Sequence, residues 1–258
     1  MAAWRRFLVG LVLALAPAAA ALASCPGPIA SREPLLWRAA LAANEVGLTF
    51  LGHSSFLIES SGGVTIVTDF NGYHRPRFTP DIVTMNNAHS THYTDHPDAG
   101  IKYVLRGWDP SGGMAVHNLS YRDVHIRNVP TNVRDVGGTR YNGNSIFIFE
   151  IGDLCIAHLG HLHHVLTPEH VADIGQIDVV LVPVDGTYTM DQGGMLEVID
   201  QLHAPLLIPM HYFGPRTLEL FLSRLKDRYA VRLSETPAVT LTRATLPKLP
   251  EALVLPGN

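Results

Sequence analysis

The order in which strand and helix patterns follow one another constrains the fold of this chain most. From residue 46 onward, short runs rich in β-branched and aromatic residues are separated by turns containing Gly and Ser. Farther along, strand patterns alternate with helical ones. Strands followed by strand–helix units indicate an α/β layered domain in which polar side chains at strand ends gather in one cleft. Strands are expected at 46–51, 55–59, 64–68, 81–85, 102–105, 121–129, 145–150, 153–158, 179–182 and 206–209, and helices at 167–174, 192–202 and 216–228.

Length and composition favour a single domain. The 258 residues, 47% hydrophobic and 16% charged, suffice for one sizeable core. We expect this domain over residues 46–245, preceded by a signal peptide at 1–25 and by a linker at 26–45 that includes a short helix at 34–44, and followed by a tail at 246–258. A formal net charge of −4 and the lack of a Lys/Arg-rich run disfavour a nucleic-acid partner.

The N-terminus has the pattern of an export signal. Two arginines precede an uncharged apolar run over residues 7–23 that ends in small residues, as in a secretory signal peptide. Residues 22–25 are similar to a bacterial lipoprotein box, in which Cys25 would be lipidated and become the first residue. Ordinary cleavage near Ala23 and an uncleaved membrane anchor are the alternatives. We expect an exported protein, either in the bacterial periplasm or held at the membrane by a lipid on Cys25.

A histidine-rich loop is the strongest indication of chemistry. Residues 87–96 contain three histidines and a carboxylate directly after the expected strand 81–85. Neutral imidazole is the commonest metal ligand, and a loop leaving a strand can aim several side chains at one point. A solvated polar loop is the alternative, but further polar residues follow other expected strands and can converge on the same cleft. The loop residues are His89, His92, Asp95 and His96, and the others are His53, Asp69, His161 and His211.

Together these motifs resemble the metallo-β-lactamase superfamily, in the branch of ascorbate-6-phosphate lactonase-like and N-acyl-phosphatidylethanolamine phospholipase D-like hydrolases. The resemblance covers about residues 46–225 and rests on the order and spacing of several motifs. It implies a four-layer αβ/βα sandwich with a zinc cleft at one edge of the sheets. The motifs lie at residues 51–56, 68–69, 89–96, 158–161, 180–190 and 208–212.

The resemblance also shows which family ligands are replaced. In the family, a His-x-His-x-Asp-His loop, a later His, a bridging Asp and a last His hold two metal ions. An ungapped alignment places the four loop ligands on Asn87, His89, Thr91 and His92, so that two of the four are changed. A shifted alignment would end the loop on Asp95 and His96, which are therefore reserve ligands. Elsewhere, the later His falls near Asn132, the bridging Asp on His161, the first-region Asp on Asp69 and the last His on His211.

These replacements imply one metal ion rather than two, because Thr91 and His161 cannot supply the anionic groups of a dinuclear site. Zn²⁺ is the expected ion, with Fe²⁺ or Mn²⁺ as alternatives. The catalytic candidates Asp69 and Asp95 would each accept a hydrogen bond from a ligand histidine and fix its tautomer. A strand-ending turn is the alternative for Asp69. The expected ligands are His89, His92, His161 and His211, and the possible cleft residues are His53, Asn87, Thr91, His96, Asn132, Tyr188 and Tyr212.

Several of these residues have structural alternatives. His53 is as compatible with capping a tight turn as with an active-site role, and Tyr188 and Tyr212 with forming an aromatic wall. Three protein ligands would leave a position for water, whereas four would saturate the ion. We therefore expect an exported hydrolase that attacks an ester, lactone, amide or phosphoester of a small molecule with a metal-bound hydroxide. The alternative is a non-catalytic descendant of the fold that binds a metal or ligand.

Overall fold

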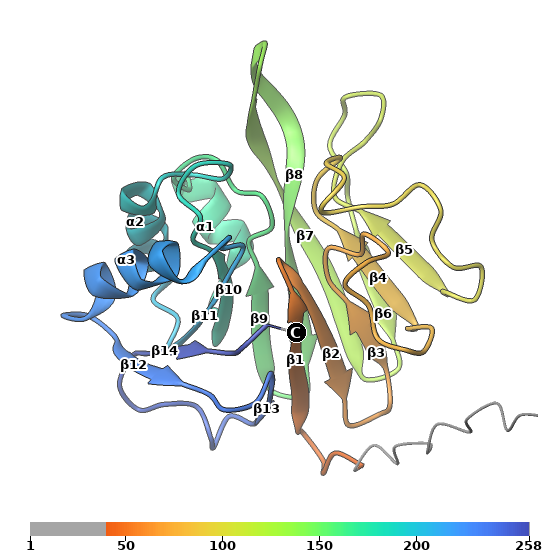
Figure 1. Cartoon of the computed structure of the whole chain (residues 1–258). Helices are drawn as coiled ribbons and strands as arrows, with labels where there is room; N and C mark the ends of the chain where they lie inside the picture. The colour runs from red at the N-terminus through yellow and green to blue at the C-terminus, as the bar shows by residue number, and fades with distance from the viewer. Residues whose placement is uncertain (1–39, 258) are drawn as a thin grey trace, which may run out of the picture. The chain divides into compact units, whose positions relative to one another are not determined.

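The computed structural model describes residues 40–257, which contain fourteen strands and three helices (Figure 1). The expected signal peptide, Cys25 and the linker up to residue 39 lie outside the described residues. Residues 40–44 end in a turn, in which the Glu45 N–H donates to the Ala42 carbonyl at 3.0 Å. The prediction of a helix at 34–44 is therefore wrong for residues 40–44, the part that the structure describes.

The first sheet contains six strands in the order β13-β1-β2-β3-β4-β5. Neighbours from β13 to β3 are antiparallel, whereas β3, β4 and β5 run parallel. The carboxyl ends of these three parallel strands therefore meet at one edge of the sheet. The strands are β1 Val46–Gly52, β2 Ser55–Ser60, β3 Thr65–Val67, β4 Ile82–Met85, β5 Tyr103–Arg106 and β13 Ala238–Leu241.

The second sheet contains eight strands in the order β12-β14-β11-β10-β9-β8-β7-β6. The strands from β6 to β9 are antiparallel, and those from β9 to β12 along this order are parallel. β14 pairs with both β11 and β12, so the sheet extends into the expected tail at 246–258. The strands are β6 Asn118–Tyr121, β7 Val124–Asp135, β8 Gly138–Ile151, β9 Leu154–His158, β10 Val179–Pro183, β11 Leu206–Met210, β12 Ala230–Leu233 and β14 Glu251–Val254.

All three helices cover the outer face of the second sheet, on the left in Figure 1. α1 (Pro168–Ile174) begins at Thr167, whose hydroxyl accepts from the His170 N–H. α2 (Gln192–Leu202) is capped by Asp191, and α3 (Pro215–Leu225) follows β11. Side-chain caps of this kind satisfy N–H groups that have no partner within a helix. None of the described helices is long and apolar enough to cross a membrane.

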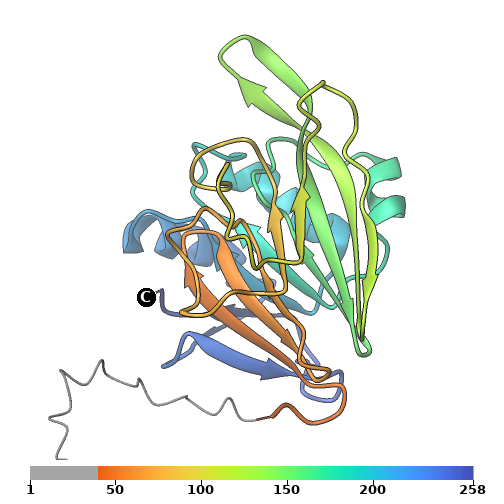
Figure 2. The same ribbon diagram turned by 90° about the vertical axis from the view of Figure 1, so that its right-hand side faces the viewer.

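The main core lies between the two sheets. Leu48 and Phe56 of the first sheet pack in one buried cluster with Phe147 and Ile208 of the second. The outer face of the first sheet is covered differently, because loop residues such as Phe70 pack there against strand residues. Figures 1 and 2 show loops on this face where a four-layer sandwich would have helices. The two mixed sheets agree with the predicted α/β sandwich. In the described residues, loops form the outer layer on the first sheet, and helices form it on the second (Figures 1 and 2).

The hairpin of β7 and β8 extends past the other strands in both views (Figures 1 and 2). Its two strands have 12 and 14 residues, whereas the other described strands have at most 7. Because β8 also pairs with β9, the base of this hairpin lies beside the segment that leaves β9 at His158. Two backbone N–H groups of β7, those of Asn132 and Arg134, donate to histidine side chains of that segment.

Candidate metal centre

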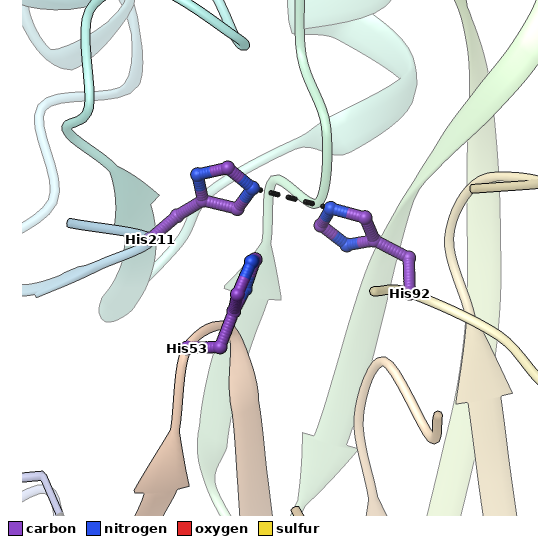
Figure 3. Close-up of side chains that lie close together, drawn as sticks. All are labelled: His53, His92 and His211. Atoms are coloured by element: carbon purple, nitrogen blue, oxygen red, sulfur yellow. Dashed lines mark hydrogen bonds between the residues drawn. The ribbon is translucent and has the colours of Figure 1, made fainter. Parts of the chain in front are cut away.

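Three imidazole rings converge where the two sheets meet at the ends of their strands. His53 lies in the turn between β1 and β2, His92 in the loop after β4, and His211 directly after β11. One nitrogen from each ring lies within 4.8 Å of a nitrogen of the other two. In Figure 3 the ring of His53 rises from its turn toward the space between His92 and His211. The group combines side chains from both sheets.

Unusual backbone conformations create this convergence. His53, Asp69 and His211 have φ angles of 53°, 45° and 55°, in the left-handed region that non-glycine residues seldom occupy. Each such residue costs roughly 1–3 kcal/mol, and such conformations cluster at functional sites. The His211 N–H donates to the His53 carbonyl at 2.7 Å, which ties the turn of the first sheet to the end of β11. The left-handed backbone at His53 and His211 and the hydrogen bond between them therefore set the positions of these two rings.

His92 is oriented by a buried carboxylate. Its Nδ1 donates to Asp69 Oδ2 at 2.6 Å, and neither side chain is exposed to solvent. Burial alone would raise the pKa of Asp69, but His92, His158 and the Asn86 N–H hold that pKa well below its usual range. Asp69 is thus a carboxylate and keeps a proton on Nδ1 of His92. The lone pair of His92 is consequently on Nε2.

His211 has a second carboxylate behind it. Its Nδ1 lies 3.0 Å from Asp185 Oδ1, a close contact without the alignment of a full hydrogen bond. Burial would raise the pKa of Asp185, but His211 and the Thr189 hydroxyl hold it well below its usual range. This carboxylate favours a proton on Nδ1 and a lone pair on Nε2 of His211. The Nε2 atoms of His92 and His211 are 3.2 Å apart (Figure 3).

The third ring, His53, has a buried nitrogen without a hydrogen-bond partner. Its Nδ1 lies 3.0 Å from Ser54 Oγ, whereas its Nε2 is buried and forms no hydrogen bond. Burial, followed by nearby His211 and His92, lowers the pKa of His53 from 6.5 to about 3, so that the ring is neutral. Buried polar atoms normally have partners, and two facing lone pairs need a proton or cation between them. Three such imidazoles fit a metal ion such as Zn²⁺.

His161 lies against this trio. Its ring centroid is 4.7 Å from that of His92 and 5.3 Å from that of His211. Its Nδ1 lies 2.5 Å from His163 Nε2. Burial, followed by His92, lowers the pKa of His161 to about 2, and burial followed by Arg134 lowers that of His163 to about 4. Both rings are therefore neutral near pH 7.

His89 lies farther out than the other three predicted ligands. It is exposed, its ring centroid is 6.0 Å from that of His92, and its Nδ1 contacts Thr91 Oγ1 at 2.9 Å. The His92 N–H donates to the His89 carbonyl at 2.7 Å, so the loop turns between the two residues. The structure thus groups His92 and His211 tightly, adds His53 and leaves His89 at the exposed rim. The ligand roles themselves stay predictions.

The two candidate carboxylates lie in different environments. Asp69 makes the hydrogen bond to His92 that the sequence led us to expect of it. Asp95 is exposed in the loop after His92, as is His96, whose N–H donates to Thr94 Oγ1 at 3.1 Å. The catalytic role of each carboxylate stays a prediction, but only Asp69 contacts one of the converging histidines.

The remaining predicted cleft residues are spread more widely. Asn87 accepts from the Arg140 guanidinium at 2.6 Å, and the Asn132 N–H donates to His164 Nε2 at 3.0 Å. Tyr212 is half-buried and packs against the main core, with its ring 6.3 Å from that of Phe50.

An exposed aromatic pair lies on one side of the three rings. The ring of Phe213 is 5.4 Å from His211 and 5.7 Å from His53, and Tyr188 lies 5.3 Å from Phe213. Both aromatic residues are mostly exposed, at 62% for Phe213 and 64% for Tyr188. Tyr188 therefore contributes to an aromatic rim beside the histidines.

Two buried residues hold the site together, of which the sequence interpretation did not single out Asp185 and included His158 only within a motif. Asp185 follows β10 as His211 follows the parallel β11, and that position after a buried strand was the available signal. His158 ends β9; its Nε2 donates to the Ser54 carbonyl at 2.7 Å, and its Nδ1 accepts from the Asn86 side chain at 3.0 Å. It therefore joins the two sheets beneath the three rings.

Comparison with known proteins identifies the family. A model of the β-lactamase superfamily domain matches residues 47–211. A solved structure from Thermotoga maritima, described as a candidate Zn-dependent hydrolase of the metallo-β-lactamase superfamily, is 32% identical and superposes with a TM-score of 0.60, covering 83% of this chain and 100% of the other. The chain belongs to the metallo-β-lactamase superfamily. The family resemblance and the sandwich fold expected from the sequence are thereby confirmed.

Two further proteins resemble this chain in sequence or in fold. A UPF0173 metal-dependent hydrolase of Salinibacter ruber is 26% identical over 215 residues, which cover 70% of this chain and 91% of the relative. A metallo hydrolase from Ignicoccus hospitalis superposes with a TM-score of 0.56 at 21% identity, covering 76% of this chain and 98% of the other. At that identity the likeness concerns the fold alone.

Proposed function

We propose that this metal-dependent hydrolase of the metallo-β-lactamase superfamily binds one ion, preferably Zn²⁺, on His53, His92 and His211. Its substrate would be a small molecule with an ester, lactone, amide or phosphoester bond. The observation that carries the proposal is the convergence of three imidazole rings, in which His53 Nε2 is buried without a partner and the Nε2 atoms of His92 and His211 face each other at 3.2 Å. Catalytic zinc sites have three protein ligands and keep one position for water or substrate.

The charges around the three rings support a divalent cation. Neutral imidazoles bring no charge, but Asp69 and Asp185 place two carboxylates in contact with His92 and His211. The two negative charges, each in contact with a proposed ligand, balance the charge of one divalent ion. Carboxylates in this position also keep the ring proton on Nδ1 and so leave Nε2 for the metal. A single ion agrees with this charge balance.

Held on these three residues, such an ion would polarise a substrate oxygen and lower the pKa of a water molecule to about 7. The chain's own residues position these groups. Asp69 holds the Nδ1 proton of His92, and Ser54 orients the ring of His53 through its hydroxyl at 3.0 Å. Phe213 and Tyr188 offer an apolar surface beside His211, suited to an apolar part of the substrate.

Metal analysis combined with a hydrolysis panel tests this proposal. Purified protein should contain one transition metal per chain and hydrolyse at least one generic ester, lactone, amide or phosphodiester in a chelator-sensitive way. His211→Ala should lose both metal and turnover. His125→Ala, which removes a surface histidine bonded to Glu150, should lose neither. A protein that binds metal but hydrolyses nothing would favour the non-catalytic alternative, and a metal-free protein would contradict the site.

We propose in addition that the protein is exported. Support comes from the apolar run at residues 7–23 and the lipoprotein-like residues 22–25. In this proposal the hydrolase acts in the bacterial periplasm, either free or held by a lipid on Cys25. Mass analysis of the mature N-terminus distinguishes the two forms.

A further inference from the structure

The segment after β9 places His161 beside the three converging rings and fixes it through the β7–β8 hairpin. The His161 N–H donates to Asn144 Oδ1 at 2.9 Å, and the Asn144 amide donates to Thr131 Oγ1 at 2.8 Å. Asn144 belongs to β8 and Thr131 to β7. The backbone of His161 is thus anchored independently of any metal.

A chain of hydrogen bonds determines which nitrogen of His161 carries the proton. The Arg134 N–H donates to His163 Nδ1 at 3.0 Å, and a backbone N–H can only donate. A neutral His163 must then carry its proton on Nε2, which lies 2.5 Å from His161 Nδ1. Nδ1 of His161 is therefore an acceptor, so that a neutral His161 carries its own proton on Nε2.

The second nitrogen of His161 is available to a bound molecule. Among residues 40–257 no protein group bonds His161 Nε2, and this atom is not fully enclosed, in contrast to His53 Nε2. The ring meets those of His92 and His211 edge-to-face, at 83° and 75°. An N–H group beside the metal ligands cannot itself bind a metal, because coordination needs the nitrogen lone pair.

We propose that His161 is a catalytic hydrogen-bond donor, which presents Nε2–H to the substrate oxygen on which negative charge develops, and that it is not a metal ligand. The inference rests on the proposed hydrolase function, because the acceptor is an oxygen of the substrate. A positioned donor of this kind changes kcat by roughly 10²–10³-fold. His163 is a positioning residue, since it acts through His161 by fixing the tautomer.

The end of β7 keeps His163 in place. The Arg134 guanidinium donates to the carbonyls of Thr187 and Thr189 at 2.8 and 3.2 Å, so the strand that bonds His163 is tied to the loop after Asp185. The neighbouring His164 also accepts a backbone N–H of β7, from Asn132, but it bonds none of the converging histidines. His164 therefore offers a matched control for His163.

Tautomer analysis by NMR tests the proposal without relying on turnover. Long-range ¹H–¹⁵N spectra of the full zinc-loaded protein, labelled at histidine and assigned with His161→Gln and His163→Gln, should show protons on Nε2 of both residues. A proton on Nδ1 of His161, with zinc on its Nε2, would overturn the proposal. This readout is informative even if no substrate is found, so its failure is distinguishable from failure of the proposed function.

Metal content and kinetics provide the second test. His161→Ala should keep one zinc per chain while kcat falls by roughly 10²–10³-fold with little change in KM. His163→Ala should keep zinc and lower kcat, whereas His164→Ala should leave kcat unchanged. Loss of zinc from folded His161→Ala, or equal kcat values for the His163 and His164 variants, would refute the assigned roles.

Discussion

Replacing Asp69 with Asn should weaken metal binding without removing a ligand. Asp69 uses both carboxylate oxygens, because Oδ2 accepts from His92 at 2.6 Å and Oδ1 accepts from the Asn86 N–H at 3.0 Å. An asparagine has one acceptor oxygen, so Asp69→Asn must leave one of these donors facing an NH₂ group. All three residues are fully buried, and water cannot replace the lost acceptor. The variant also removes the charge that keeps the proton of His92 on Nδ1.

The expected loss follows from these contacts. Removing the partner that orients a ligand histidine costs roughly 10–100-fold in metal affinity, or about 1.4–2.7 kcal/mol. The buried unsatisfied donor adds about 1–3 kcal/mol of lost folding stability. Competition with a chromophoric chelator measures the affinity, and circular dichroism with urea denaturation measures the stability. Asp95→Asn is the control, because Asp95 is exposed and has no hydrogen bond to the three histidines.

An unchanged metal affinity of folded Asp69→Asn would refute the orienting role of this carboxylate. A loss in Asp95→Asn of the same size would show that the shifted ligand alignment describes the loop better. The experiment thus separates the two carboxylates that the sequence alone treats alike.

Three further predictions follow from the site and the N-terminus. The metal-free protein should become less stable as pH falls, because the pKa values of His53 and His161 are about 3 and 2 in the folded chain but 6.5 when unfolded. The unfolded chain then binds protons that the folded chain does not, which lowers the free energy of unfolding by at most about 1.4 kcal/mol per pH unit for each histidine. Phe213→Ala should lower kcat/KM for esters with an aromatic or long acyl group by roughly 3- to 10-fold and spare the smallest esters. The mature protein should lack the leading residues and begin near Ala23 or at a lipidated Cys25.

For each of these predictions, a specific experimental result would contradict it. Urea denaturation of the metal-free protein that shows no loss of stability between neutral pH and pH 5 would exclude neutral, buried histidines. For the aromatic rim, Leu220→Ala is the control, since Leu220 is exposed on α3, and equal effects of both variants would deny Phe213 a specific contact. An intact Met1 in protein from the native host would contradict export.

The sequence placed three of the candidate residues close to where the structure has them, because each follows a strand. His211 and Asp69 follow β11 and β3 closely, and His92 lies in the first loop after β4. Such positions can be inferred because strand patterns are regular and the ends of parallel strands meet at one edge. The same reasoning could have found Asp185 after β10, but a lone aspartate is also a common turn residue.

The sequence could not distinguish His53 from His89 as the third ring. That choice depends on the left-handed backbone of His53 and on the turn in which the His92 N–H bonds the His89 carbonyl. Both are consequences of the packed sheets rather than of local residue preference. The alignment with the family loop favours His89, whereas the folded chain brings His53 of the β1–β2 turn toward the space between His92 and His211 (Figure 3).

Two short strands near the C-terminus could not be predicted from the sequence patterns either. All four residues of β12 are exposed, so they lack the alternation that marks a half-buried strand. β14 is short and lies in the expected tail, yet three of its four residues are buried between β11 and β12. Its position depends on pairing with strands that are distant in sequence.

Metal content of two single variants, His53→Ala and His89→Ala, tests the central claim most directly. Both remove one imidazole close to His92, but only His53 belongs to the three rings whose nitrogens lie within 4.8 Å of one another. Elemental analysis of the folded, full-length proteins after equilibration with zinc should find one ion per chain in the wild type and in His89→Ala, and a large loss in His53→Ala. Zinc retained by His53→Ala but lost by His89→Ala would contradict the proposed centre.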